Sequence, residues 1–172
     1  MGSKIADNVL WAITDNKQTL KKTCNCKIKS SSLTDENCTA RCIVYQATMS
    51  SNEGKETYIG ETGDQFKTRH LYHKASIKDR RKMNSTELSK DIWSLRDASA
   101  EYTLSWKMIT RAKTYTNISK RCHICLTKIY FIIRKPDLCS LNKRNELATA
   151  CPHARKYLIK YAVTRGLLTF SF

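Results

Sequence analysis

A β-hairpin pattern constrains the fold of this chain more than any other feature of its sequence. Residues 43–49 (IVYQATM) are mostly β-branched, aromatic or apolar, which predicts a strand. Residues 50–54 (SSNEG) have turn composition, and residues 56–60 (ETYIG) then predict a returning strand. A sheet built on this hairpin needs helices or a second sheet to cover it, and the rest of the chain shows which.

The residues after the hairpin predict helices and one more strand. A helix is expected over residues 64–79 with Asp64 as its N-cap, and a second helix is expected from residue 84. Alternation of apolar and polar residues over 102–108 predicts a strand, and the apolar segment 120–134 predicts a buried helix. This order of elements predicts an α+β fold, in which a small three-stranded antiparallel sheet is flanked by helices.

Composition divides the chain into four segments. We expect a partly disordered or helical leader at 1–23, a Cys-rich segment at 24–42, the α+β domain at 43–150, and a basic C-terminal helix and tail at 151–172. No apolar run approaches the roughly 18 residues that a membrane-spanning helix needs, and no secretory signal is evident. The expected location is therefore the nucleus or the cytoplasm, with no membrane partner.

The charge balance indicates a polyanionic partner. The 172 residues include 31 Lys and Arg against 15 Asp and Glu, a formal net charge of +16. Such an excess favours nucleic acid as a partner, although a basic but merely solvated surface is the alternative. Contacts of this kind go to phosphates, so they give affinity without sequence choice. The residues expected to contact DNA are Lys67, Lys74, Lys78, Arg80, Arg81, Lys143 and Arg144.

Four side chains around the predicted hairpin have the chemistry that phosphodiester cleavage needs. Tyr45 and Tyr58 lie on the two strands, and Arg69 and His73 share one face of the next helix because they are four residues apart. An arginine binds phosphate in a bidentate manner, and a tyrosine or histidine can transfer a proton. Taken one at a time, each residue is weak evidence, because a tyrosine on a hairpin more often only packs and an arginine or histidine on a basic helix face is usually only solvated.

The order of these motifs carries a family resemblance. The segments IVYQAT, YIGETGDQFKTRHLYH, NSTELSKDIWSLRD, KRCHICLTKIYFII and LNKRNEL resemble the GIY-YIG endonuclease family, and most closely the endonuclease domain of Penelope-like retroelements. The resemblance covers about residues 24–158 and makes residues 43–150 the nuclease domain. It implies metal-dependent nicking of DNA, Mg²⁺ as the catalytic cofactor, and a reverse transcriptase domain as a partner in a parent polyprotein.

The resemblance also implies a role for each motif residue. Tyr45 would activate the attacking water or lie next to the base, with Tyr58 supporting it. Arg69 would bind and polarise the scissile phosphate, and His73 would assist in proton transfer or contact the phosphate. Asn142 would be the asparagine of the last motif.

Lys128 departs from the family pattern. Related elements carry Cys-x-x-Cys-Leu-x-Glu where this chain has CHICLTK, so Lys128 stands in the place of the metal-binding glutamate. A lysine cannot bind Mg²⁺. Catalysis is then either impaired while DNA binding remains, which is the interpretation we favour, or rescued by another acid such as Glu87 or Glu146. The alternative function is a non-catalytic, zinc-stabilised module that binds DNA or RNA.

The cysteines suggest structural zinc. Cys122 and Cys125 have zinc-knuckle spacing, and Cys151 and His153 can complete four ligands for tetrahedral Zn²⁺. The family carries a similar pattern, and reduced buried cysteines are the alternative. A second possible zinc site, which rests on a resemblance to another family cluster, consists of Cys24, Cys26, Cys38 and Cys42.

Overall fold

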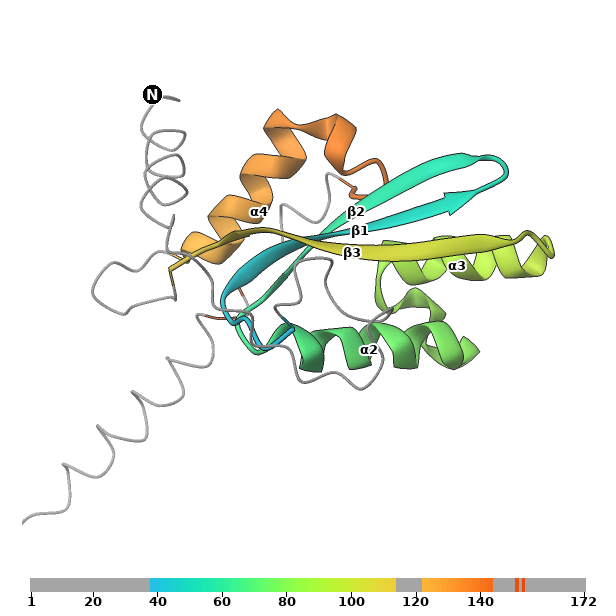
Figure 1. Cartoon of the computed structure of the whole chain (residues 1–172), viewed down its shortest axis with the longest axis horizontal. Coiled ribbons are helices and arrows are strands. Elements are labelled where there is room, and N and C mark those ends of the chain that lie inside the picture. The colour runs from blue at the N-terminus through green and yellow to red at the C-terminus, as the bar shows by residue number, and fades with distance from the viewer. Residues whose placement is uncertain (1–37, 114–121, 144–150, 152, 154–172) are drawn as a thin grey trace, which may run out of the picture.

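The structure, a computed structural model, describes residues 38–113 and 122–143 together with Cys151 and His153 (Figure 1). Its strands β1 (Ile43–Ser51), β2 (Gly54–Thr62) and β3 (Tyr102–Arg111) form an antiparallel sheet in the order β2-β1-β3. Its α-helices are α2 (Phe66–Lys78), α3 (Glu87–Asp97) and α4 (His123–Arg134), with short 3₁₀ helices η2 (Arg80–Ser85) and η3 (Pro136–Leu138). These elements confirm the predicted α+β class and three-stranded sheet. The expected leader, most of the Cys-rich segment and nearly all of the C-terminal segment lie outside the described residues.

The hairpin of β1 and β2 is longer than its sequence pattern suggests. The two strands pair without a break from Ile43 opposite Thr62 to Ser51 opposite Gly54. The turn is therefore shorter than the predicted segment 50–54. Gly54 follows it with a φ of 144°, a conformation that side chains other than glycine rarely adopt.

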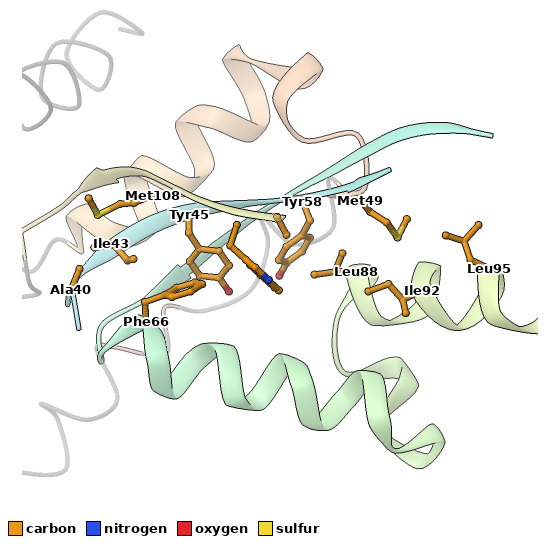
Figure 2. Close-up of a cluster of buried hydrophobic side chains, with 12 residues drawn as sticks. Ala40, Ile43, Tyr45, Met49, Tyr58, Phe66, Leu88, Ile92, Leu95 and Met108 are labelled. Atoms are coloured by element: carbon orange, nitrogen blue, oxygen red, sulfur yellow. The ribbon is translucent and has the colours of Figure 1, made fainter. Parts of the chain in front are cut away.

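The sheet, with β1 as its central strand, is covered by helices on both faces. Figure 1 shows α2 and α3 on one face and α4 on the other. Tyr45 and Ala47 of β1 pack on the α2 and α3 side with Phe66 and Leu88, as Figure 2 shows in part. Val44 and Ile59 instead join the cluster against α4. The near-continuous apolar run of β1 is thus explained, since a strand covered on both faces has no exposed side for polar residues.

Two helix starts differ from the predictions. Asp64 does not cap α2, because Gln65 is the N-cap residue and makes no side-chain capping bond. Backbone bonds satisfy the helix start instead: Phe66 N donates to Ala40 O at 2.9 Å, and Lys67 N donates to Cys38 O at 2.8 Å. The second helix begins after a 3₁₀ helix rather than at residue 84, with Thr86 and Ser89 forming the capping box.

The last described helix lies across the face of the sheet that α2 and α3 leave open. α4 begins at His123, with Cys122 as its N-cap, so it starts later than the predicted residue 120. It contributes Ile124, Phe131 and Ile132 to the core on this face. Among the described residues, no helix has the length and apolar character required to cross a membrane.

Candidate active site and metal centre

The hydroxyl of Tyr45 is the centre of a hydrogen-bonded chain. Arg69 Nε donates to this oxygen at 3.1 Å, and the oxygen lies 2.7 Å from His73 Nε2. An arginine can only donate, so the phenol oxygen accepts from Arg69 and gives its own proton to His73. The proton of the neutral His73 ring is therefore on Nδ1. Three of the four predicted side chains are joined directly, and Arg69 also hydrogen-bonds to the fourth, Tyr58.

Gly60 makes room for this chain. Tyr45 and Gly60 are opposite each other in the hairpin. A Cβ at position 60 would lie 2.3 Å from both Cζ and the hydroxyl oxygen of Tyr45, so the ring lies directly over the glycine backbone. Figure 2 shows the phenols of Tyr45 and Tyr58 pointing from the sheet towards α2. The glycine that ends the predicted second strand therefore makes room for the first tyrosine itself.

Burial keeps both Tyr45 and His73 neutral. Tyr45 is fully buried, and desolvation raises the pKa of its phenol well above the ordinary value although Arg69 opposes the shift. Desolvation, helped by the charge of Arg69 and by His70, lowers the pKa of His73 to about 3. At neutral pH the phenol therefore holds its proton, and the neutral imidazole accepts only a hydrogen bond from it.

Acid is expected to destabilise the fold through His73. The pKa of His73 is about 3 when folded against 6.5 when unfolded, so the unfolded chain takes up the proton first as the pH falls. The stability that neutral His73 provides is complete above pH 6.5 and is lost as the pH falls towards 3. Within this window His73 alone should lower the free energy of unfolding by up to about 1.4 kcal/mol per pH unit, beside the share of His70, whose pKa is lowered to about 4. Urea titrations across the window measure it, and His73→Gln should flatten the profile; an equally steep profile in that variant would contradict the assignment.

A pocket of about 240 Å³ lies beside the edge strand β2, where α2 and α4 approach from opposite faces of the sheet. Arg69 contributes to it from α2 and Lys128 from α4, so two cations face the same space. The residues that line the pocket are Tyr58, Glu61, Thr62, Gly63, Asp64, Thr68, Arg69, Tyr72, Lys128 and His153. Tyr45 and His73 lie behind this lining, connected to it through Arg69.

Glu61 is a pocket residue that the sequence analysis missed. Its Oε1 accepts from the thiol of Cys125 at 3.7 Å, and its Oε2 is buried without a hydrogen-bond partner among the described residues. Desolvation raises the pKa of this carboxyl, while Lys128 and His153 oppose the shift. The sequence does contain a signal for it. Glu61 lies two residues after Ile59, and residues two apart in a strand share a face, so alternation places this carboxylate on the apolar face of β2.

Of the two carboxylates suggested as substitutes for the missing glutamate, Glu87 does not line this pocket. Glu87 forms ion pairs with Lys90 at 2.7 Å and with Lys143 at 2.9 Å, at the start of α3. Glu146 lies outside the described residues. The carboxylates that line the pocket are those of Glu61 and Asp64.

Asn142 contacts backbone rather than the pocket. Its Oδ1 accepts from Ile59 N at 2.7 Å, and its Nδ2 donates to Ile59 O at 3.0 Å. The amide thus pairs with the exposed edge of β2 as a neighbouring strand would. This places Asn142 as a residue that positions the strand carrying Tyr58 and Glu61.

Among the described residues, the other basic side chains expected at DNA do not line the pocket. Lys74 and Lys78 line a separate groove with His70, on another side of α2. Arg80 forms a bidentate pair with Asp97 at 2.8 Å, and Arg81 pairs with Asp79. Lys67 is half-buried and Arg144 lies outside the described residues.

A Cys/His cluster next to the pocket could hold a metal such as zinc. The ligand atoms of Cys122, Cys125, Cys151 and His153 all lie within 4.8 Å of one another, and no other such cluster occurs in the described part of the chain. Cys122 caps α4 and Cys125 lies in its first turn, so the helix start positions two sulfurs. Hydrogen bonding between these thiols lowers the pKa of Cys122 and raises that of Cys125, which readies one sulfur as a thiolate. Three soft sulfurs and one imidazole are a donor set that zinc prefers.

The second possible zinc site can be judged only in part. Cys38 is buried, and the thiol of Cys42 donates to Gly63 O at 3.5 Å. Neither belongs to the cluster above. Cys24 and Cys26 lie outside the described residues.

The pocket has the chemistry of an oxyanion site with a neutral hydrogen-bonded pair behind it. Arg69 and Lys128 can bind a phosphate, and Tyr45, itself held by His73, hydrogen-bonds to Arg69. A divalent hard cation would need oxygen ligands, for which the lining offers two carboxylates beside a lysine. In comparisons with known proteins, the chain matches no family model, no curated protein and no solved structure.

Proposed function

We propose that this chain is a GIY-YIG-type endonuclease domain, similar to that of Penelope-like retroelements, which binds DNA at the pocket but whose nicking activity is impaired. One observation carries the proposal. The hydrogen bonds from Arg69 to Tyr45 and from Tyr45 to His73 lie directly behind a pocket that Arg69 and Lys128 line with positive charge. This function requires access to DNA, in the nucleus or the cytoplasm, and the reverse transcriptase it would serve is a separate domain.

The cations of the pocket would hold a backbone phosphate. Arg69 can grip two of its oxygens, while Lys128 approaches from the opposite helix. Tyr58 lies on the pocket wall and also holds Arg69 by a hydrogen bond, so it fixes the direction of the guanidinium. Tyr45 and His73 would support Arg69 from behind through the shared hydroxyl, and a proton released at the phosphate would go to a base of higher pKa than His73.

Lys128 is the reason we expect weak nicking. Mg²⁺ would supply charge stabilisation at the phosphate, and it needs oxygen ligands with an open coordination position. Lys128 instead places a cation in the pocket, where its charge acts on the carboxyl group of Glu61. The Cys/His cluster would hold a structural Zn²⁺ that fixes the start of α4 to the segment with Cys151 and His153, and no step of the cleavage needs it.

The second candidate function is a zinc-stabilised module that binds DNA or RNA without cleaving it. The same lysine favours it, because two cations suit phosphate binding better than they suit metal-assisted hydrolysis. The two candidates differ in whether a single change restores activity.

Nicking of supercoiled plasmid with Mg²⁺ separates them. We expect little or no nicking by the native chain and at least a tenfold gain in Lys128→Glu, since a lost metal ligand normally costs orders of magnitude in rate. The gain should disappear when Arg69→Gln is added. Native nicking that survives the loss of both Tyr45 and Arg69 would overturn the site. A Lys128→Glu variant that stays inactive would favour the binding module.

DNA binding itself is tested with a charge-matched pair of variants. Arg69→Gln removes a cation from the pocket, whereas Lys107→Gln removes one from the exposed face of β3, at the opposite edge of the sheet. We expect Arg69→Gln to lower the affinity for a short duplex about tenfold and Lys107→Gln to change it far less. Fluorescence anisotropy at fixed salt measures both. Equal losses would mean that the pocket is not the binding site.

A further inference from the structure

His153 belongs both to the metal cluster and to the pocket wall. We infer that it is a phosphate-binding residue: with Nδ1 on the metal, its Nε2–H points into the pocket as a fixed hydrogen-bond donor. The inference rests on the proposed function, because the phosphate is the one that Arg69 would hold.

One edge of the ring faces the sulfurs. Nδ1 of His153 lies 3.4 Å from the sulfur of Cys122, 3.4 Å from that of Cys125 and 3.7 Å from that of Cys151. It is therefore the ring nitrogen that joins the cluster. The ring is held in place by the same contacts, since the two sulfurs of α4 are fixed by the helix start.

The other edge packs against Gly63, at the wall of the pocket. A Cβ on Gly63 would lie 3.2 Å from Cδ2 and 3.3 Å from Nε2 of His153, so the ring packs closely on this glycine. Gly63 and His153 both line the pocket, together with Arg69 and Lys128. The small residue at position 63 lets the imidazole come this near to the strand end.

Metal on one nitrogen decides what the other nitrogen can do. A neutral imidazole carries a single proton, on either nitrogen, and one of the two then accepts rather than donates. When Nδ1 holds a metal ion, the proton must be on Nε2, and the charge of the ion strengthens this donor. The cations Arg69 and Lys128 and the carboxylates Glu61 and Asp64 line the same pocket as His153, so a phosphate would compete with carboxylates for this proton.

Metal binding and phosphate binding are then coupled. The cluster fixes the ring and its proton, and α4, which carries two of the sulfurs, also carries Lys128. By linkage, a phosphate held by His153 should in turn tighten metal binding by the same factor.

The direct test is NMR of the zinc-loaded protein with isotope-labelled histidine and arginine nitrogens. Titration with thymidylyl-thymidine, which offers one phosphodiester, should shift the Nε2 and Hε2 resonances of His153 together with the Nε resonance of Arg69. A shift at Arg69 without one at His153 would overturn this inference and leave the proposed function standing. No shift at either residue would overturn both.

A ligand-swapped variant tests the same point without a change of charge. The double substitution Cys151→His with His153→Cys keeps three sulfurs and one imidazole but moves the imidazole off the pocket wall. We expect it to retain zinc, measured by metal analysis, and to bind a short duplex about tenfold more weakly than the native chain. Native affinity in a zinc-loaded swap, with Arg69→Gln still weakening binding, would refute the role of His153.

Discussion

The substitution Gly60→Ala, which adds only a methyl group, should strongly destabilise this protein. The added Cβ would lie 2.3 Å from the phenol of Tyr45, closer than real contacts allow, so the ring must move. Tyr45 is fully buried against Phe66 and Trp106, and its hydroxyl holds both Arg69 and His73. Moving it costs packing and leaves buried polar groups unpaired, so we expect a loss of about 3 kcal/mol in the free energy of unfolding.

Urea denaturation of matched variants measures this effect. Gly63→Ala is the control, because its Cβ would meet only the His153 ring at 3.2 Å, a contact that a shift of a few tenths of an ångström relieves. That variant should lose less than about 1 kcal/mol. In a Tyr45→Ala background, Gly60→Ala should be nearly neutral because the obstacle is gone. A large cost that persists there would show that Gly60 acts through its backbone conformation and not through Tyr45.

Removal of zinc is expected to have the second large effect on stability. The four ligand atoms come from the start of α4 and from Cys151 and His153, so the metal would join segments that are far apart in sequence. Zinc at a thousandfold excess over its Kd stabilises a folded state by about 4 kcal/mol. Chelation should therefore lower the melting temperature by on the order of 10 °C.

Two Cys→Ser variants provide the comparison. Cys122→Ser removes a ligand and should lower the melting temperature as chelation does, with no further loss when chelator is added. Cys42→Ser lies outside the cluster and keeps a hydroxyl that can donate to Gly63 O, so it should respond to chelator like the native chain. Cobalt substitution reports the thiolates directly by absorption. A melting temperature that chelation leaves unchanged would refute a stabilising metal here.

The secondary structure was predictable where a local pattern decides it. The hairpin, the second helix and the third strand all follow from periodicity, and the apolar residues Leu88, Ile92 and Leu95 of α3 share one buried face. The helix starts were predicted less well. Asp64 looked like a cap for α2, but the chain preceding β1 satisfies the first backbone donors, and such a long-range partner leaves no local signal.

The metal cluster was also predictable, because ligand types and spacing are properties of the sequence. Cys122, Cys125, Cys151 and His153 were singled out by the knuckle spacing and do lie together. The position of Glu61 was not predicted, because it belongs to none of the motifs and only its place on the buried face of β2 marks it. That His153 also reaches the pocket depends on Gly63 and on the placement of α4, which no spacing rule expresses.

By itself, the sequence determined the class of the fold, the hydrogen-bonded side chains Tyr45, Arg69 and His73, and the members of the Cys/His cluster. Each of these depends on local periodicity or on side-chain chemistry at fixed spacing. Only the tertiary structure decided that Lys128 faces Arg69 across one pocket, that Asn142 pairs with the edge of β2, and that Lys74 and Lys78 face elsewhere. The physical reason is that these relations depend on how α2 and α4 pack on opposite faces of the sheet, and packing is set by contacts between residues distant in sequence.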